Sequence, residues 1–267
     1  MTGMLRTTAN PVLAENVRLR LLHVLPDAKR VDVFGVFAKA DEIHAPAVYA
    51  TWPELHNSTL FYEPPPFTKT PGVDYVGLDE RAEVFYQQWT KVEACFNLVQ
   101  QRETKTRMRY DFFIRARSDL YYFFPVNSWL TADTAAVQTG AGLGCTPTDH
   151  WASMPRHLAP LYASAGQVTY DVSMTPARFV SLAHMCHCPS PGSIWPECFI
   201  SGWLVLRGVA IKQVCDHEYE LWRHTHQYPN GTLSDFWGNV LLGLLVEPGV
   251  KPWPTPTSCS GVSNETV

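Results

Sequence analysis

The chain has 267 residues, of which 46 % are hydrophobic and 17 % are charged, so it can bury a sizeable core and does not have the composition of a disordered chain or a coiled coil. Its 21 lysines and arginines against 25 aspartates and glutamates give a net charge of −4. A nucleic-acid-binding protein usually carries a basic excess, so we expect no nucleic-acid partner. No stretch reaches the roughly 18 consecutive apolar residues of a membrane span, and we expect none in this chain.

Helices and strands are predicted to alternate from the start of the chain. Apolar residues recur with helical spacing over 11–25, and the apolar run 31–37 predicts a buried strand. The following segment, 41–80, is rich in proline and is interpreted as a long irregular excursion with one strand near Tyr75 and Val76. The clearest predicted helix covers about 80–105, where a single apolar stripe repeats every three or four residues. The members of this stripe are Phe85, Trp89, Val92, Phe96 and Val99.

The second half of the chain continues the alternation. A central strand is predicted at 112–114, a short strand at 135–138, and a glycine-rich loop at 140–144. Ser153 is expected to cap a helix from about 154. The next helix is predicted to begin at Pro196 and Glu197 and to run to about Leu206, where Gly208 can terminate it before a late strand. This order predicts an α/β fold with a mostly parallel central sheet flanked by helices. We expect one domain over 10–246 and a proline-rich extended tail over 247–267.

The strand after the long helix ends in charged residues. Side chains alternate along a strand, so Arg115, Arg117 and Asp119 are expected to share one face with Phe113 and to lie at the carboxyl end of the strand. Ligands of open α/β sheets bind at that end of the strands. Arginine offers planar donors to phosphate, and an aspartate beside phosphates can hold Mg²⁺ or Mn²⁺. The pattern suits a nucleoside diphosphate with its metal, and it equally suits an arginine–aspartate pair that closes a strand on the surface.

These residues carry a resemblance to a known family. The segment Tyr110-Asp111, the Phe-Phe-Ile strand and Arg115-x-Arg117-x-Asp119-Leu120 resemble the central motif of poorly characterised glycosyltransferase-like proteins with a GT-A-type nucleotide-sugar-binding fold, from algae, plants, fungi and large viruses. The segments Thr148–Arg156 and Pro196–Leu204 are similar to two later motifs of that family. The resemblance spans about 12–215 and depends on the order and spacing of the motifs. GT-A domains open with a strand that contacts the nucleotide, and we expect that strand to be missing because residues 1–9 are short and polar.

The resemblance implies a glycosyltransferase that moves a sugar from a nucleotide-diphosphate donor to a hydroxyl of a glycan, lipid or protein. It implies donor binding by Arg115, Arg117 and Asp119, with Asp119 as the ligand of Mn²⁺ or Mg²⁺. Asp149 and Glu197 are expected on the acceptor side, one of them as the catalytic base. The alternative is a catalytically inactive sugar- or nucleotide-binding domain of the same fold.

Other patterns leave further alternatives open. His184, Cys186, His187 and Cys188 have the residue types of a zinc site but no matching second pair, and one of the late histidines 217, 224 and 226 could be a metal ligand. Three Asn-x-Ser/Thr sequons occur without a visible signal peptide. The location therefore stays open between the secretory lumen, including the Golgi, and the cytoplasm.

Overall fold

The computed structural model describes residues 9, 11–23, 30–68, 79–117, 120–122, 133–141, 147–170, 196–214, 221–223, 226–227 and 233–234. The helices of this part are α2 (Pro11–Val17), the π-helix η1 (Arg18–Leu22), η2 (Lys39–His44), α3 (Ala45–Thr51), η3 (Pro53–Leu55), α4 (Asp79–Thr106), α5 (Ala159–Ala163), η6 (Ser164–Tyr170) and α7 (Pro196–Leu206). The strands are β1 (Gly35–Ala38), β2 (Thr59–Tyr62), β3 (Phe112–Ala116), β4 (Leu120–Tyr122), β5 (Ala136–Ala141), β6 (Pro147–Pro155), β7 (Ala210–Val214), β8 (Leu221–Arg223), β9 (His226–Gln227) and β10 (Leu233–Ser234).

The N-terminal part forms a parallel strand–helix–strand unit. β1 and β2 pair in parallel, and α3 lies between them in the chain. The predicted strand therefore begins at Gly35, four residues later than expected. Residues 63–68 form no helix or strand, as predicted, but the prediction of an irregular excursion is wrong over 41–62. The reason is that Pro46 and Pro53 stand in the first turns of α3 and η3, where proline starts a helix instead of breaking one. The strand predicted near Tyr75 lies outside the described residues, as do residues 1–8, so the missing opening strand stays a prediction.

The long helix is confirmed with nearly the predicted bounds. α4 covers Asp79–Thr106, and every member of the predicted stripe is at most 4 % exposed. Phe85 and Trp89 stack at 4.9 Å between ring centroids, and Phe96 meets Phe113 of β3 edge to face at 5.7 Å. The stripe therefore holds α4 against the sheet over most of its length.

The main sheet has four strands in the order β3-β6-β5-β7. β5 and β7 are parallel, whereas β6 is antiparallel to both of its neighbours, β3 and β5. The α/β class with flanking helices is confirmed, but the sheet is mixed instead of mostly parallel. In the described part β3 stands at one end of this sheet, so the prediction of a central strand is wrong.

The prediction of a helix from residue 154 is also wrong. Ser153 is fully buried in β6, opposite Ile114 of β3 and Gln138 of β5, so pairing with two strands outweighs its local capping preference. The helix begins only at Ala159.

The end of α7 agrees with the prediction. Gly208 has a positive φ of 68°, and the N–H groups of Gly208 and Val209 donate to the carbonyls of Val205 and Leu204, which closes the helix and turns the chain into β7.

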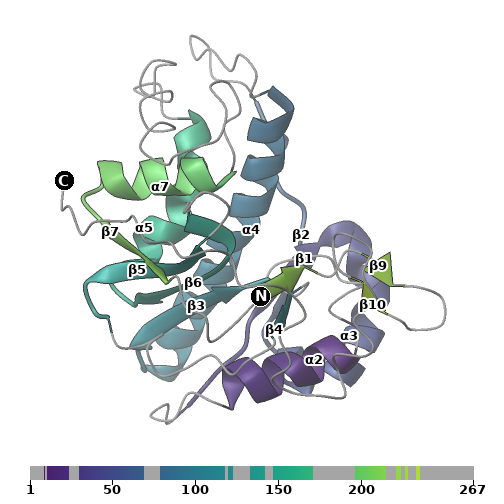
Figure 1. Ribbon diagram of the computed structural model, residues 1–267. Coiled ribbons are helices and arrows are strands. Elements are labelled where there is room, and N and C mark those ends of the chain that lie inside the picture. The colour runs from purple at the N-terminus through teal and green to yellow at the C-terminus, as the bar shows by residue number, and fades with distance from the viewer. Residues whose placement is uncertain are drawn as a thin grey trace.

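Two hydrophobic clusters cover the opposite faces of the sheet. The larger joins α4, α5 and α7 to one face, with Trp89, Phe113, Met154, Tyr162 and Trp203 among its members. The second packs α2, β1 and α3 against Ala116 and Trp151 on the other face. Figure 1 shows α5 and α7 above the sheet, α4 crossing behind it, and α2 and α3 below. No helix of the described part is long and apolar enough to cross a membrane.

Candidate functional site at the carboxyl edge of the sheet

Four strands end at the same edge of the molecule. β3, β5 and β7 all run in one direction, because β6 is antiparallel to both β3 and β5 while β7 is parallel to β5. β1 follows the direction of β3. Its lead-in residue Asp32 accepts a hydrogen bond from Tyr110, just before β3, and Phe37 of β1 lies in the same cluster as Ala116, at the end of β3. We call this shared edge, where β6 also begins, the carboxyl edge.

The carboxyl edge collects the chain segments that carry the predicted site residues. Arg117, half-buried, follows β3 directly, and the backbone of Asp149 lies near the start of β6. Glu197 lies in the first turn of α7, and α7 ends at the Gly208 turn, where the chain reverses into β7. The N-terminus of α7 therefore lies toward the carboxyl edge of β7 (Figure 1). Asp119 lies outside the described residues, and the side-chain positions of Asp149 and Glu197 are not described. The backbone therefore brings together the segments of three predicted residues.

Arg115 occupies a different environment from the one its motif suggests. It shares a face of β3 with Phe113, as predicted, but that face lies under α4. Its guanidinium is centred 5.0 Å from the ring centroid of Trp89, and the residue is 3 % exposed. Arg115 is thus a buried positive charge stacked on an aromatic ring, at the strand end that leads to Arg117.

Lys91 is a cation near this edge, on the long helix but outside its predicted apolar stripe. It is half-buried on α4, one turn before Ala94 and Cys95, which pack on Val36 of β1. Burial lowers the pKa of the Lys91 amine, and the nearby charge of Asp41 in η2 opposes that shift. Lysines on the polar face of a helix have no distinguishing spacing, so the sequence held no signal for this position.

The opposite, amino edge of β3 is closed by an ion pair that is largely shielded from solvent. Arg156 donates to the two carboxylate oxygens of Glu103 in α4 at 2.8 and 2.7 Å, and the two side chains are 11 % and 12 % exposed. Glu103 also accepts the backbone N–H of Tyr110 at 3.1 Å. The hydrogen bonds from Arg156 hold the pKa of the Glu103 carboxyl below its usual value, although burial opposes this. Arg156, which belongs to a motif of the resemblance, therefore has a structural contact at the edge away from the candidate site.

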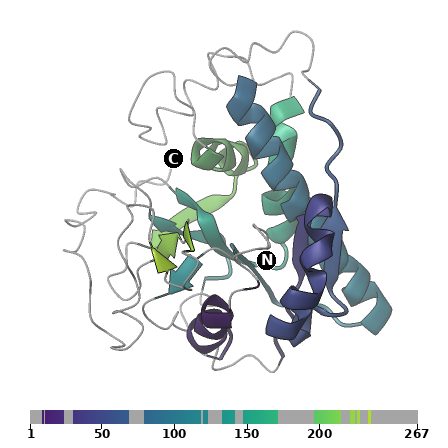
Figure 2. The same ribbon diagram turned by 90° about the vertical axis from the view of Figure 1, so that its right-hand side faces the viewer.

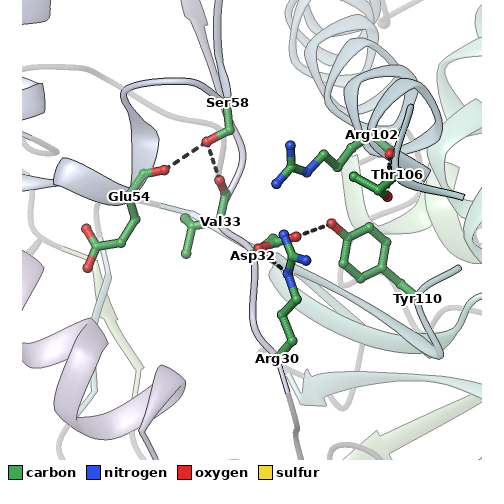
Figure 3. Close-up of polar contacts among 8 residues, drawn as sticks. All are labelled: Arg30, Asp32, Val33, Glu54, Ser58, Arg102, Thr106 and Tyr110. Carbon is green, nitrogen blue, oxygen red and sulfur yellow. Dashed lines mark hydrogen bonds and ion pairs between the residues drawn. The ribbon is translucent and has the colours of Figure 1, made fainter. Parts of the chain in front are cut away.

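Asp32 and Tyr110 form a second contact at the amino edge (Figure 3). The phenol of Tyr110 donates to Asp32, and Arg30 donates to the same carboxylate at 2.9 Å. Burial and the hydrogen bond to the Asp32 carboxylate raise the pKa of Tyr110 to about 12. Burial opposes ionisation of Asp32, but its hydrogen bonds from Arg30 and Tyr110 prevail and lower its pKa. An aspartate inside the apolar run 31–37 was the available sequence signal for this contact.

Comparisons with known proteins identify no family for the chain. No protein-family model matches it, and no curated protein is significantly similar.

Among the described residues no three histidine, cysteine, aspartate or glutamate side chains are grouped so that they could hold a metal ion. The predicted metal ligand Asp119, the possible zinc ligands 184–188 and the histidines 217 and 224 lie outside that part, and the backbone of His226 lies in β9. The proposal of a bound metal therefore depends on Asp119 and its motif.

Proposed function

We propose that the chain is a glycosyltransferase that uses a nucleotide-diphosphate sugar as donor and an acceptor hydroxyl as second substrate. The observation that carries the proposal is the common carboxyl edge, toward which β1, β3, β5 and β7 all run and at which β6 begins. Ligands of α/β sheets bind outside the carboxyl ends of the strands. In this chain those ends lead to the arginine and aspartate positions of the motif.

The diphosphate would be bound by the segment that follows β3. Arg117 would donate to its oxygens in the planar geometry that suits phosphate. Asp119 would hold Mn²⁺ or Mg²⁺, which when bound supplies positive charge to the leaving diphosphate. Arg115 and Lys91 would add positive potential from less solvated positions, where charges are screened less than at the surface.

The acceptor would approach from the side of β6 and α7. One of Asp149 and Glu197 would take the proton of the acceptor hydroxyl while its oxygen bonds to the anomeric carbon and the bond to the diphosphate oxygen breaks. The other carboxylate would bind the acceptor. Asp149 belongs to β6, an inner strand of the sheet, and Glu197 belongs to α7, which packs on the sheet.

The experiment is a calorimetric titration of the chain with a panel of nucleoside diphosphates and their sugars, with and without Mn²⁺. We expect one nucleotide to bind and both Asp119→Ala and Arg117→Ala to weaken it, about tenfold or more for a lost charged hydrogen bond. Arg109→Ala is the matched control, because Arg109 is an exposed arginine before the opposite end of β3. Binding that neither site variant changes would overturn the site assignment.

Turnover separates the enzyme from the alternative. Release of free nucleoside diphosphate from the bound sugar nucleotide, slowed in Asp149→Asn or Glu197→Gln with unchanged donor binding, would support transfer chemistry. If the chain binds the donor but releases no nucleoside diphosphate whichever class of acceptor is added, it is an inactive binding domain.

A further inference from the structure

The C-terminal end of α4 presents a concentration of basic side chains. Lys105, Arg107 and Arg109 are exposed there, and Arg102 is half-buried one turn earlier. Arg30 joins them because its neighbour Asp32 is hydrogen-bonded to Tyr110, and 43 % of its side chain is exposed. Figure 2 shows this end of α4 at the lower right extremity of the described part of the molecule. Together with Val31 and Met108 we call these residues the α4 basic surface.

The carboxylates of Glu103 and Asp32 in this region are paired, and because the partner of Asp32 is Arg30, the basic excess comes from Arg102, Lys105, Arg107 and Arg109. Glu103 is bound by Arg156 and is 12 % exposed, and Asp32 is bound by Arg30 and Tyr110 with 21 % of its side chain exposed. Asp111 is exposed nearby but does not cancel the basic excess. A chain with a net charge of −4 therefore carries a local positive surface.

Large apolar side chains are exposed in the same place. Val31 and Met108 are each 42 % exposed, and they stand next to Arg30 and Asp32 on one side and to Arg107 and Arg109 on the other. Aliphatic side chains mixed with arginine and lysine are typical of surfaces that lie in the interfacial layer of a bilayer. Basic residues at a helix C-terminus are favourable for the helix dipole alone, but the dipole does not account for exposed aliphatic residues.

The backbone at the centre of this surface is strained. Arg107 follows α4 with φ of 54°, in the left-handed region that favours glycine, and the residue with a positive φ after α7 is Gly208. The chain thus keeps a basic side chain at a position where glycine would relieve the backbone. Such a cost is expected where a side chain serves a function.

We propose that the α4 basic surface binds the surface of an anionic lipid bilayer. This surface projects from one end of the longest helix. A projecting surface can lie against a flat bilayer more easily than it can enclose a peptide. Each arginine or lysine near an anionic bilayer strengthens binding about fivefold, which is the change in partition that about 1 kcal/mol produces. Acidic residues elsewhere on the chain are repelled only weakly by the bilayer if they lie farther from it than the Debye length of about 8–10 Å, so they reduce binding little.

The experiment is flotation of the full chain with vesicles of phosphatidylcholine alone or mixed with phosphatidylserine. We expect binding only to the mixed vesicles, with a loss as salt is raised. Arg107→Gly and Arg109→Gln should each weaken binding about fivefold. Arg107→Gly removes the charge while it relaxes the backbone, so a loss of binding in this variant does not come from unfolding. Met108→Ser should reduce the binding that remains at high salt.

Lys212→Gln is the matched control, because Lys212 is 62 % exposed on β7, away from this surface. Equal binding to both vesicle types would overturn the proposal, as would an equal loss in Lys212→Gln and Arg109→Gln. Failure of the chain to float with the mixed vesicles while it binds an acidic protein would assign the surface to a protein partner instead. None of these outcomes depends on glycosyltransferase activity.

Discussion

Replacing Glu103 by glutamine should destabilise the fold strongly, because it removes the charge that Arg156 needs. Arg156 is 11 % exposed and makes two contacts with the carboxylate of Glu103. Glutamine has nearly the same size and keeps one oxygen, which can still accept the N–H of Tyr110. The substitution therefore removes one charge and one acceptor and leaves the packing of the helix unchanged.

The magnitude follows from the burial of the pair. Removing one partner of a buried ion pair costs about 3–5 kcal/mol, because the remaining charge is left uncompensated. Arg156 retains its position over the ring of Phe96, at 4.6 Å from the centroid, and about a tenth of its surface meets solvent. Both facts favour the lower end of that 3–5 kcal/mol range, so we expect Glu103→Gln to lower the free energy of unfolding by about 3 kcal/mol at neutral pH.

Urea unfolding of the wild type and Glu103→Gln at several pH values provides the assay. Because the pKa of Glu103 is lowered in the folded state, its contribution is fully present above its ordinary value of 4.5 and is lost as the pH falls through the folded-state pKa. The difference between the two proteins should therefore shrink in acid. Glu83→Gln is the matched control, since Glu83 is exposed on the same helix and accepts a hydrogen bond only from Gln87 among the described residues. A difference below about 0.5 kcal/mol at neutral pH, as for a surface pair, would refute the reasoning.

Three further predictions concern single residues. Gly208→Ala should lower the free energy of unfolding by about 1 kcal/mol through its positive φ alone, since nothing lies within 4 Å of the added methyl group; an unchanged Tm would contradict this. Spectroscopic titration should show a tyrosine with a pKa of about 12 that Tyr110→Phe removes, and the wild type should lose more stability than this variant between pH 10 and that value, because the unfolded phenol ionises first. Lys91→Met should raise Tm, because burial disfavours the charged amine, and should weaken nucleotide binding; a lower Tm would assign Lys91 a stabilising role.

The parts of the fold that follow from local patterns were predictable from the sequence. The stripe from Phe85 to Val99 placed α4 within a residue or two at either end, and Gly208 placed the end of α7. Ser153 misled the prediction because a serine two residues before a proline suggests a helix cap, and only its pairing partners in β3 and β5 show that it belongs to a buried strand. Pro46 misled it in the other direction, since a proline can begin a helix as readily as it ends one.

The candidate site was predictable only to the level of the strand. Alternation along β3 correctly placed Arg115 on the face of Phe113, but it could not show that this face lies under Trp89. The contacts of the amino edge join residues 53 and 78 positions apart, Glu103 with Arg156 and Asp32 with Tyr110, and no local pattern links such pairs.

The two edges of β3 therefore serve different purposes, and this separation is itself testable. The ion pair and the Asp32–Tyr110 contact stabilise the amino edge, whereas the motif residues proposed to bind the donor follow the opposite end of the strand. Glu103→Gln, examined at a urea concentration and temperature where it is still folded, should keep the wild-type Kd for nucleotide, whereas Arg117→Ala should raise that Kd. A nucleotide Kd that rises in Glu103→Gln as much as in Arg117→Ala would show that the donor site depends on the amino edge, and the assignment of the site to the carboxyl edge would then be wrong.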